Sequence, residues 1–445
     1  MASAKTQPAR GMRDFLPEDV RKREYVIGVI KEVYERYGFE PLETPAAENI
    51  ETLMGKYGEE GNQLIFKILK RGVHAGTGEA DLALRYDLTV PLARVVAEYR
   101  DKLPKFFKRY QIQPVWRADR PARGRYREFY QCDVDVLGSR SMIVEAEIIS
   151  ASSEALSKLG FSDFVVRLNH RKVLTGILDA AGIAPEKHGP ALIALDKLDK
   201  IGADGVLREF AEREVAPANS ASELLALFEN KATNEQVLEQ LEKFMGAHPV
   251  GLEGIRDLRE IVSYLSTSSL VELDPSLARG LSYYTGAIME IQVNDLAGSL
   301  GGGGRYDNLV GMFLGQDIPA CGFSLGLERI IVVMSERNMF PVNLLRSPAD
   351  VMIAIWREGA TDALSLAAEL RAQGIRVDVY PDRDVKLGTQ ISYAAKRSVP
   401  FVAFIGEDER DKGLVVLKNL TSGKQETLDR GAVAHIVKVE VGGVE

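Results

Sequence analysis

Cysteine is scarce in this chain of 445 residues. Only Cys132 and Cys321 are present, far apart in the sequence, and neither belongs to a Cys-x-x-Cys pair. A disulfide framework is therefore not expected, and a reducing, cytoplasmic environment is favoured. Histidine is also sparse, and none of the five histidines has a partner at ligand spacing. Because structural zinc needs such clusters, we expect no metal ion bound by the protein's own side chains.

Long apolar runs are missing as well. Residues 1–10 are polar and lack the apolar stretch of a secretory signal. The longest apolar runs, such as residues 351–356, have the length of a strand and fall far short of a membrane span. We therefore expect a globular protein without a membrane segment.

The usual nucleotide fingerprints are absent too. The sequence contains no G-x-x-x-x-G-K-[ST] phosphate loop, and no G-x-G-x-x-G opens a helix after a strand. Four consecutive glycines occur at 301–304, but Arg305-Tyr306-Asp307 follows them. We interpret this run as a tight turn rather than a phosphate cradle. A bound nucleotide would have to be held by other residues.

Positive charge is in the minority but is concentrated in one place. The formal net charge is −8, yet residues 105–127 contain eight basic residues and a single acid, Asp119. In isolation such a run is typical of a solvated loop face. On an acidic chain it also indicates where a nucleic acid could bind, because the basic residues must then be clustered.

Apolar periodicity predicts an α+β chain. We expect a helix over 21–37, strands over 109–116 and 126–137 joined by a hairpin loop, and a helix over 143–159. Residues 170–260 are rich in Ala, Leu and Glu and predict an inserted helical domain. Strands return at 280–293, and Gly322 begins a glycine-rich entry into an apolar helix. From 350 onward strands and helices alternate, which predicts a small α/β domain with a largely parallel sheet.

Three arginines lie on separate core elements: Arg117, Arg279 and Arg329. Guanidinium groups grip phosphate oxygens in a fixed geometry and stay charged at any working pH, so this set suits a bound triphosphate. Arg329 is embedded in an apolar stretch and must find an anionic partner or reach water. An ion pair with Glu328 is an equally good explanation for that arginine alone.

At this point the motifs resemble a known family, the class II aminoacyl-tRNA synthetases, and within it the histidyl-tRNA synthetases. The resemblance covers essentially the whole chain, and its two histidine-specific boxes are more specific than the class motifs. The segments that carry it are RGMRDFLPED at 10–19, the helix 21–37 with Pro45 (motif 1), VWRADRPARGRYREFYQCDVDVLG at 115–138 (motif 2), RGLSYYTG at 279–286, GGGGRYDNL at 301–309, GFSLGLERI at 322–330 (motif 3) and the tail with GEDERDKGLVVLKNLTSGKQ.

The resemblance implies a class II catalytic core built on an antiparallel sheet flanked by helices. It places that core at 1–169 and 261–341, the helical insertion domain at 170–260, and an α/β anticodon-binding domain at 348–445. It also implies a homodimer formed through motif 1.

The resemblance further assigns residues to ATP. Arg117 would hold the α-phosphate, and Arg279 would approach the same phosphate from the other side, so both are expected to be catalytic. In this family Arg279 stands where other class II enzymes place a metal ion. Arg329 would hold the γ-phosphate, with Arg125 and Asp119 nearby in motif 2. Magnesium is expected with ATP, bound mainly through phosphate oxygens and water.

For histidine the resemblance assigns Asp87, Thr89 and Gln131 to the α-amino group. Asp135 and Tyr284 would take the two imidazole nitrogens, and Tyr306 would line the same pocket. Selecting a ring with two distinct nitrogens does require two polar partners, and an analogue lacking one nitrogen would strand a buried group. Tyr283 and Tyr284 are expected to be neighbours on a strand, so that at most one of them points into the pocket.

The implied reaction joins histidine to ATP as histidyl-adenylate and then transfers it to the 3′-hydroxyl of the terminal adenosine of tRNA(His). Three residues depart from the common family pattern. Asp119 and Asp135 stand where glutamate is frequent, and Ser282 stands where aspartate is common. Ser282 receives no role.

Two other functions compete with this one. A non-catalytic, histidine-sensing regulatory paralogue usually lacks the anticodon-binding domain and loses phosphate-binding arginines, whereas this chain retains both features. A sister synthetase for another amino acid is disfavoured by the pairing of Asp135 with Tyr284.

Overall fold

A computed structural model describes residues 6–74, 76–216, 218–228, 233–265, 270–278, 283–345 and 347–442. The chain divides into two compact units, 1–340 and 341–445, which are described separately below. Among the described residues no helix is both long and apolar enough to cross a membrane.

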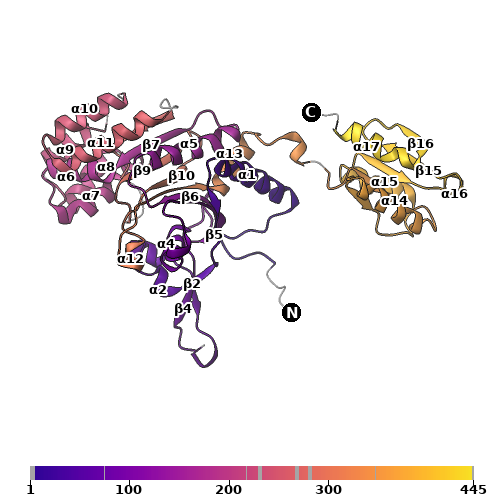
Figure 1. Cartoon of the computed structure of the whole chain (residues 1–445), viewed down its shortest axis with the longest axis horizontal. Helices are drawn as coiled ribbons and strands as arrows, with labels where there is room; N and C mark the ends of the chain where they lie inside the picture. Colours follow the sequence, from indigo (N-terminus) through magenta and orange to yellow (C-terminus); the bar gives the residue numbers. More distant parts are fainter. Residues whose placement is uncertain are drawn as a thin grey trace. The chain divides into compact units, whose positions relative to one another are not determined.

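The first unit is built on an eight-stranded sheet (Figure 1). Its outer pairs, β1 with β5 and β7 with β8, are parallel, and all inner pairs are antiparallel. This confirms the predicted α+β class with an antiparallel core. In spatial order the strands are β1 (Glu40–Pro41), β5 (Phe107–Trp116), β6 (Glu128–Leu137), β11 (Ala320–Gly326), β10 (Ser299–Arg305), β9 (Ala287–Gln292), β7 (Val165–His170) and β8 (Val271–Leu273).

The sequence of β6 explains how the sheet is packed. Side chains alternate between the two faces of a strand. Cys132, Val134 and Val136 belong to the core that the sheet forms with helices α1 (Pro17–Arg36), α5 (Ile143–Lys158) and α13 (Leu327–Glu336). The alternate residues Gln131, Asp133 and Asp135 therefore face the opposite side of the sheet. They are buried there as well, so this face carries polar groups that need partners.

The glycine run 301–304 lies inside strand β10, so the prediction of a tight turn is wrong. Each of these glycines pairs with residues of both β9 and β11. The close packing of the neighbouring strands explains the composition. A Cβ on Gly303 would come within 2.1 Å of the carbonyl oxygen of Gly322. Gly322 likewise belongs to strand β11, and the apolar helix begins only at Leu327.

A bundle of helices lies between β7 and β8 in the sequence, where a helical segment was expected. Helices α6 and α11 pack closely, because a Cβ on Gly176 would lie 2.8 Å from the Cα of Gly251. The helices of this bundle are α6 (Arg171–Ala180), α7 (His188–Leu195), α8 (Leu198–Glu212), α9 (Ala218–Ala226), α10 (Asn234–Met245) and α11 (Pro249–Tyr264).

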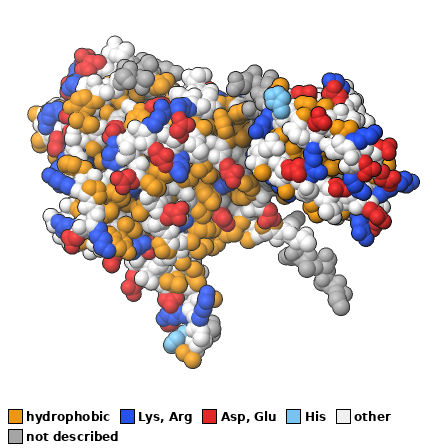
Figure 2. All heavy atoms as spheres, turned by 45° about the vertical axis from the view of Figure 1, so that its right-hand side comes forward, with side chains coloured by type: hydrophobic (Ala, Val, Ile, Leu, Met, Phe, Trp, Pro, Cys, Tyr) orange, Lys and Arg blue, Asp and Glu red, His pale blue; other side chains and the backbone are white. Residues whose placement is uncertain are grey.

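A second, three-stranded sheet forms an arm of the first unit (Figure 1). Its strands are β2 (Ala47–Asn49), β3 (Lys67–Leu69) and β4 (Ala80–Leu84), and they are antiparallel. Figure 2 shows this three-stranded sheet projecting from the unit, with charged side chains of both signs on the face in view. Short helices complete the unit: α2 (Ile50–Leu53), α3 (Gly58–Gln63), α4 (Thr89–Glu98) and α12 (Gly311–Leu314).

The second unit is a five-stranded sheet in the order β13-β12-β14-β15-β16. Strands β13, β12 and β14 are parallel, but β15 and β16 are antiparallel to their neighbours. The prediction of a largely parallel sheet is therefore wrong for the last two strands, which form a hairpin. The strands are β12 (Val351–Ile353), β13 (Val377–Val379), β14 (Phe401–Phe404), β15 (Leu414–Asn419) and β16 (Gln425–Asp429); the helices are α14 (Ala360–Ala372), α15 (Leu387–Lys396), α16 (Glu407–Arg410) and α17 (Val433–Gly442).

Candidate active site

A cavity of about 390 Å³ lies over the polar face of the eight-stranded sheet. Strands β6, β11, β10 and β9 contribute to its walls and floor, together with the loops that precede α4 and follow β5. Arg279 and Ser282 lie outside the described residues. The cavity brings together all the other residues predicted for the site: Asp87, Thr89, Arg117, Asp119, Arg125, Gln131, Asp135, Tyr283, Tyr284, Tyr306 and Arg329.

Glycine keeps the floor of this cavity flat. Gly302 is paired with Ser324 on one side and with Glu290 on the other, and all three line the cavity. A Cβ on Gly302 would meet only the carbonyl oxygen of Met289, at 3.5 Å. A Cβ on Gly322 would instead lie 1.8 Å from Oδ1 of Asp135. The glycines therefore allow a planar ligand to approach the backbone and give Asp135 room to stand over the sheet.

Two adjacent glycines of β10 provide a matched test of this floor. Gly302→Ala should leave the melting temperature within about 2 °C of wild type. It should raise the apparent dissociation constants of ligands that bind in the cavity, because the methyl group enters the cavity. Gly303→Ala should instead destabilise the fold by about 1–3 kcal/mol or more, because its methyl group meets backbone atoms of β11. Thermal melting and ligand titration of both variants check this. Equal stability losses in the two would contradict the assignment of the floor.

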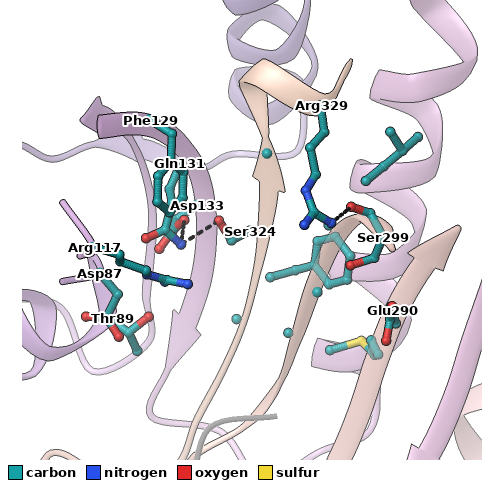
Figure 3. A pocket seen from close by; sticks show the side chains of 18 of the residues that line it. Asp87, Thr89, Arg117, Phe129, Gln131, Asp133, Glu290, Ser299, Ser324 and Arg329 are labelled. Atoms are coloured by element: carbon teal, nitrogen blue, oxygen red, sulfur yellow. Dashed lines mark hydrogen bonds between the residues drawn. The ribbon is translucent and has the colours of Figure 1, made fainter. Parts of the chain in front are cut away.

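Arg117 and Arg329 enter the cavity from opposite sides (Figure 3). The guanidinium group of Arg117 lies over the rings of Tyr86 and Phe129, at 4.3 and 5.2 Å from their centroids, and its Nε donates to the carbonyl oxygen of Tyr86 at 3.0 Å. Arg329 donates from Nη1 to the carbonyl oxygen of Ser299 at 2.5 Å. These contacts orient both guanidinium groups at the wall of the cavity, where each can bind an anionic ligand.

Glu328, the suggested ion-pair partner of Arg329, has other partners. Arg23 Nη1 lies 2.8 Å from its Oε1, Arg13 Nη2 lies 3.9 Å away, and the backbone N–H of Tyr130 donates to Oε2 at 2.9 Å. This carboxylate links the N-terminal segment to β6 and α13. Glu328 therefore balances the positive charges of Arg13 and Arg23.

Asp119 and Arg125 form an ion pair at the mouth of the cavity. Arg125 Nη2 donates to Asp119 Oδ1 at 2.7 Å, and the Arg125 side chain is 53% exposed. The hairpin loop between β5 and β6 is closed by a bridge between Ala122 and Arg125, as expected from its sequence. Because this pair is partly solvated, an anionic ligand can compete for Arg125 at little cost.

The cavity also contains buried carboxylates, of which Asp87 lies beside Arg117 (Figure 3). Asp87 is buried and accepts hydrogen bonds from the hydroxyl of Tyr57 (3.0 Å), the backbone N–H of Val90 (3.0 Å) and the hydroxyl of Tyr283 (3.2 Å). Burial raises the pKa of the Asp87 carboxyl, and these donors together with Arg117 oppose that rise. A buried carboxylate fixed in this way is suited to receive a cationic group.

Tyr283 and Tyr284 both line the cavity, so the prediction that only one could do so is wrong. That prediction assumed a strand, but β9 begins only at Ala287. In the loop before β9 the two rings stand edge to face, with centroids 5.2 Å apart. Tyr283 has its hydroxyl on Asp87, and burial raises the pKa of both phenols. They therefore act as neutral hydrogen-bonding groups.

One buried oxygen atom in the cavity, Oε1 of Gln131, accepts no hydrogen bond from any described residue, whereas Oδ2 of Asp135 forms an ion pair with Arg109 Nη2 at 2.8 Å. The amide of Gln131 donates to Ser324 Oγ at 2.9 Å (Figure 3), and the Tyr306 hydroxyl donates to Oδ1 of Asp135. A buried acceptor without a donor costs free energy, so Oε1 of Gln131 suits a ligand that brings its own N–H group.

Sequence reasoning missed several residues of this site. Asp133 lines the cavity between Gln131 and Asp135, and Arg109 lies behind it with no exposed surface. The alternation Gln-x-Asp-x-Asp on β6 was the signal for Asp133. No local signal pointed to Arg109, because its position depends on the pairing of β5 with β6. Other lining residues not predicted are Phe129, Glu290, Ser299 and Ser324. Among the described residues no group of three or more acidic, histidine or cysteine side chains could hold a metal ion.

Comparison with known proteins gives a consistent result. The family model described as histidyl-tRNA synthetase matches residues 11–330, and that described as anticodon binding domain matches residues 350–440. A histidine–tRNA ligase from Cytophaga hutchinsonii is 45% identical, with 96% of this chain and 98% of that protein covered. A histidine–tRNA ligase from Gloeobacter violaceus is 41% identical, with 96% and 97% covered.

Solved structures agree in fold. A crystal structure of histidyl-tRNA synthetase from Nostoc sp. PCC 7120 matches with a TM-score of 0.81 at 29% identity, covering 98% of this chain and 99% of that one. An ATP phosphoribosyltransferase regulatory subunit/histidyl-tRNA synthetase from Bacillus halodurans C matches with a TM-score of 0.73 at 23% identity, covering 87% and 96%. At that identity the second match shows the fold alone.

Proposed function

Since the chain belongs to the histidyl-tRNA synthetase family, we propose that its cavity binds ATP through Arg117 and Arg329 and histidine through Asp87 and Asp135. The activity is that of a histidine–tRNA ligase, which forms histidyl-adenylate and pyrophosphate and then histidyl-tRNA. The observation that carries the residue assignment is that one cavity of about 390 Å³ brings both arginines together with both buried carboxylates.

Arg117 and Arg329 would bind opposite ends of the triphosphate. Arg117 takes the α-phosphate and Arg329 the γ-phosphate, which fits their entry from opposite sides of the glycine floor (Figure 3). Arg125 exchanges its partner Asp119 for a phosphate oxygen. Arg279 takes the α-phosphate from the other side, a role that rests on the family resemblance. Fixed guanidinium groups stabilise the charge that develops in the transition state without reorganising.

Asp87, Thr89, Gln131, Asp135 and Tyr284 would hold the amino acid. The α-ammonium group lies between the carboxylate of Asp87, the hydroxyl of Thr89 and Oε1 of Gln131, which otherwise accepts no hydrogen bond from the described residues. The imidazole donates one N–H to Oδ2 of Asp135, and its other nitrogen forms a hydrogen bond with the hydroxyl of Tyr284. Tyr283 orients Asp87, and Tyr306 orients Asp135.

These placements define the first step of the reaction. The histidine carboxylate attacks the α-phosphorus in line, and pyrophosphate leaves toward Arg329. No side chain needs to transfer a proton, so the protein contributes positioning and charge stabilisation. In the second step the 3′-hydroxyl of the terminal adenosine attacks the adenylate carbonyl, a phosphate oxygen of the adenylate takes the proton, and the bond between the carbonyl carbon and the phosphate oxygen breaks to release AMP.

Four further properties belong to this proposal. Magnesium enters with ATP as part of the substrate, held mainly by phosphate oxygens and water. Two copies pair through motif 1, helix α1 and the strand after it. The helical segment 170–260 is an insertion between the two parts of the catalytic core, 1–169 and 261–341, and 348–445 reads the anticodon of tRNA(His). The enzyme acts in the cytoplasm.

ATP–pyrophosphate exchange screened over the twenty amino acids tests the proposed function. Exchange with histidine alone is the expected result. Exchange with another amino acid would favour a sister synthetase, and no exchange with any amino acid would favour a regulatory paralogue. The presence of both arginines in the cavity and of the anticodon-binding match speaks against that paralogue.

A further inference from the structure

Arg109 is a fully buried arginine that the reaction described above does not use. It lies on β5 directly opposite Asp135 of β6, one strand outside the cavity. Its Nη2 is 2.8 Å from Oδ2 of Asp135 and 3.9 Å from the carboxylate of Asp133. Two further contacts fix the guanidinium group: Nη2 donates to the carbonyl oxygen of Leu88 at 3.3 Å, and Nη1 to Oε1 of Gln111 at 3.2 Å.

Charge is not balanced in this cluster. Asp133 and Asp135 are each 2% exposed, and Arg109 is the single cation that forms an ion pair with them among the described residues. If both carboxylates are ionised, the cluster carries one surplus negative charge facing the cavity. A buried charge of this kind must be neutralised by a proton or by a cationic partner. Histidine supplies such a partner through its α-ammonium group and, when protonated, its ring.

We propose that Arg109 is a positioning residue for histidine recognition: it fixes Asp135 and keeps the Asp133–Asp135 pair ionised, so that this end of the cavity accepts hydrogen bonds and favours a cationic substrate. The proposal rests on the proposed function of the cavity. It also explains how an aspartate serves where a longer glutamate is frequent in the family. Arg109 holds Oδ2 from behind while the Tyr306 hydroxyl holds Oδ1.

The direction of the electrostatic effect follows from burial. Burial raises the pKa of both carboxyls, that of Asp133 to about 7, and Arg109 opposes the rise in both. Removing Arg109 removes what stabilises the charged form, so the pair would take up a proton at a higher pH. A protonated carboxyl donates its O–H and no longer competes well as an acceptor for an imidazole N–H.

Other titratable groups face the same pair and enter the balance. Asp87 raises the pKa of both carboxyls, Asp135 raises the pKa of Asp133, and Asp135 also raises the pKa of the Tyr306 phenol. From the elements packed around the pair, the groups that interact with it electrostatically are Tyr34 of α1, Asp87 before α4, Arg109 of β5, Cys132 of β6, Tyr284 before β9, Tyr306 after β10 and Cys321 of β11. Arg109 is the cation of this set.

The test is the pH profile of kcat/KM for histidine in ATP–pyrophosphate exchange, measured with the full chain between pH 6 and 9. Arg109→Met should move the acid limb upward by at least one pH unit, so that activity at pH 7 falls about fivefold or more and recovers at pH 9. The KM for ATP should change less than about threefold. Arg109→Lys, which retains the charge, should leave the limb within half a unit of wild type.

Asp133→Asn keeps the proposal testable if the methionine variant does not fold. Removing one carboxylate relieves the repulsion in the pair, so the acid limb should move to lower pH. The double variant Arg109→Met/Asp133→Asn should lie between the two single variants. The ring and amino group of histidine titrate identically in all assays, so differences between variants report the protein.

Two results would overturn this proposal. One is a lowered melting temperature and kcat in Arg109→Met with the acid limb unmoved, which would make Arg109 merely structural. The other is an acid limb that stays or rises in Asp133→Asn. If the wild-type chain shows no histidine-dependent exchange, the proposed function fails instead, and the two failures are thereby distinguished.

Discussion

Replacing Arg117 by alanine is expected to reduce histidine-dependent ATP–pyrophosphate exchange at least 100-fold, which corresponds to about 2.7 kcal/mol of lost transition-state stabilisation. The guanidinium group is held by two aromatic faces and the carbonyl oxygen of Tyr86, and it points into the cavity (Figure 3). In the proposed role it is therefore preorganised for a charge that grows on the α-phosphate. Because the interaction strengthens in the transition state, kcat should fall more than the ATP constant rises.

Two controls separate this effect from a loss of structure. Arg117→Lys retains the charge but not the planar fork, so an intermediate loss of about tenfold is expected. Arg208→Ala removes an exposed arginine of helix α8 and should leave exchange unchanged. The melting temperature of Arg117→Ala should fall only slightly, because a single carbonyl oxygen loses its donor. A loss of exchange below about tenfold would show that Arg117 does not contact the reacting phosphate.

The sequence was sufficient to locate the chemistry along the chain but not to pair it across strands. Arg117 and Arg329 could be identified because an arginine at the end of a strand or inside an apolar helix needs an anion wherever it lies. The alternation on β6 also shows that Gln131 and Asp135 share a face. The roles of Gln131 and Asp135, however, came from the family resemblance and not from this periodicity, and in the structure all four residues line one cavity.

The errors have a common physical origin in neighbours that are distant in the sequence. Four consecutive glycines predict a turn unless it is known that β9 and β11 pair with them on both sides. The close approach of Gly303 to the backbone of Gly322 shows why glycine is needed in this strand. Tyr283 and Tyr284 could be assigned to opposite faces only by assuming where β9 begins. Arg109 acquires its role from the register that sets it opposite Asp135. Strand register depends on the whole sheet, so no local pattern could supply it.

Asp135→Ala is expected to raise the apparent constant for histidine about 100-fold while changing that for ATP less than about threefold. The substitution removes the proposed acceptor of an imidazole N–H and would leave the ring with an unpaired buried donor, which costs roughly 1–3 kcal/mol or more when the acceptor is charged. Asp135→Asn retains an oxygen but loses the charge, so a smaller rise of about tenfold is expected. Steady-state exchange kinetics with each substrate varied in turn measures both constants.

Asp119→Ala is the matched control, because Asp119 is another carboxylate of the same cavity and is paired with Arg125. It should raise the ATP constant and leave the histidine constant nearly unchanged, the reverse of the pattern for Asp135. Removing Asp135 also strands the buried Arg109, so the variant should lose about 3 kcal/mol or more of folding stability. Circular dichroism at the assay temperature verifies that it remains folded. If Asp135→Ala raises both constants equally, Asp135 shapes the cavity as a whole and does not read the imidazole.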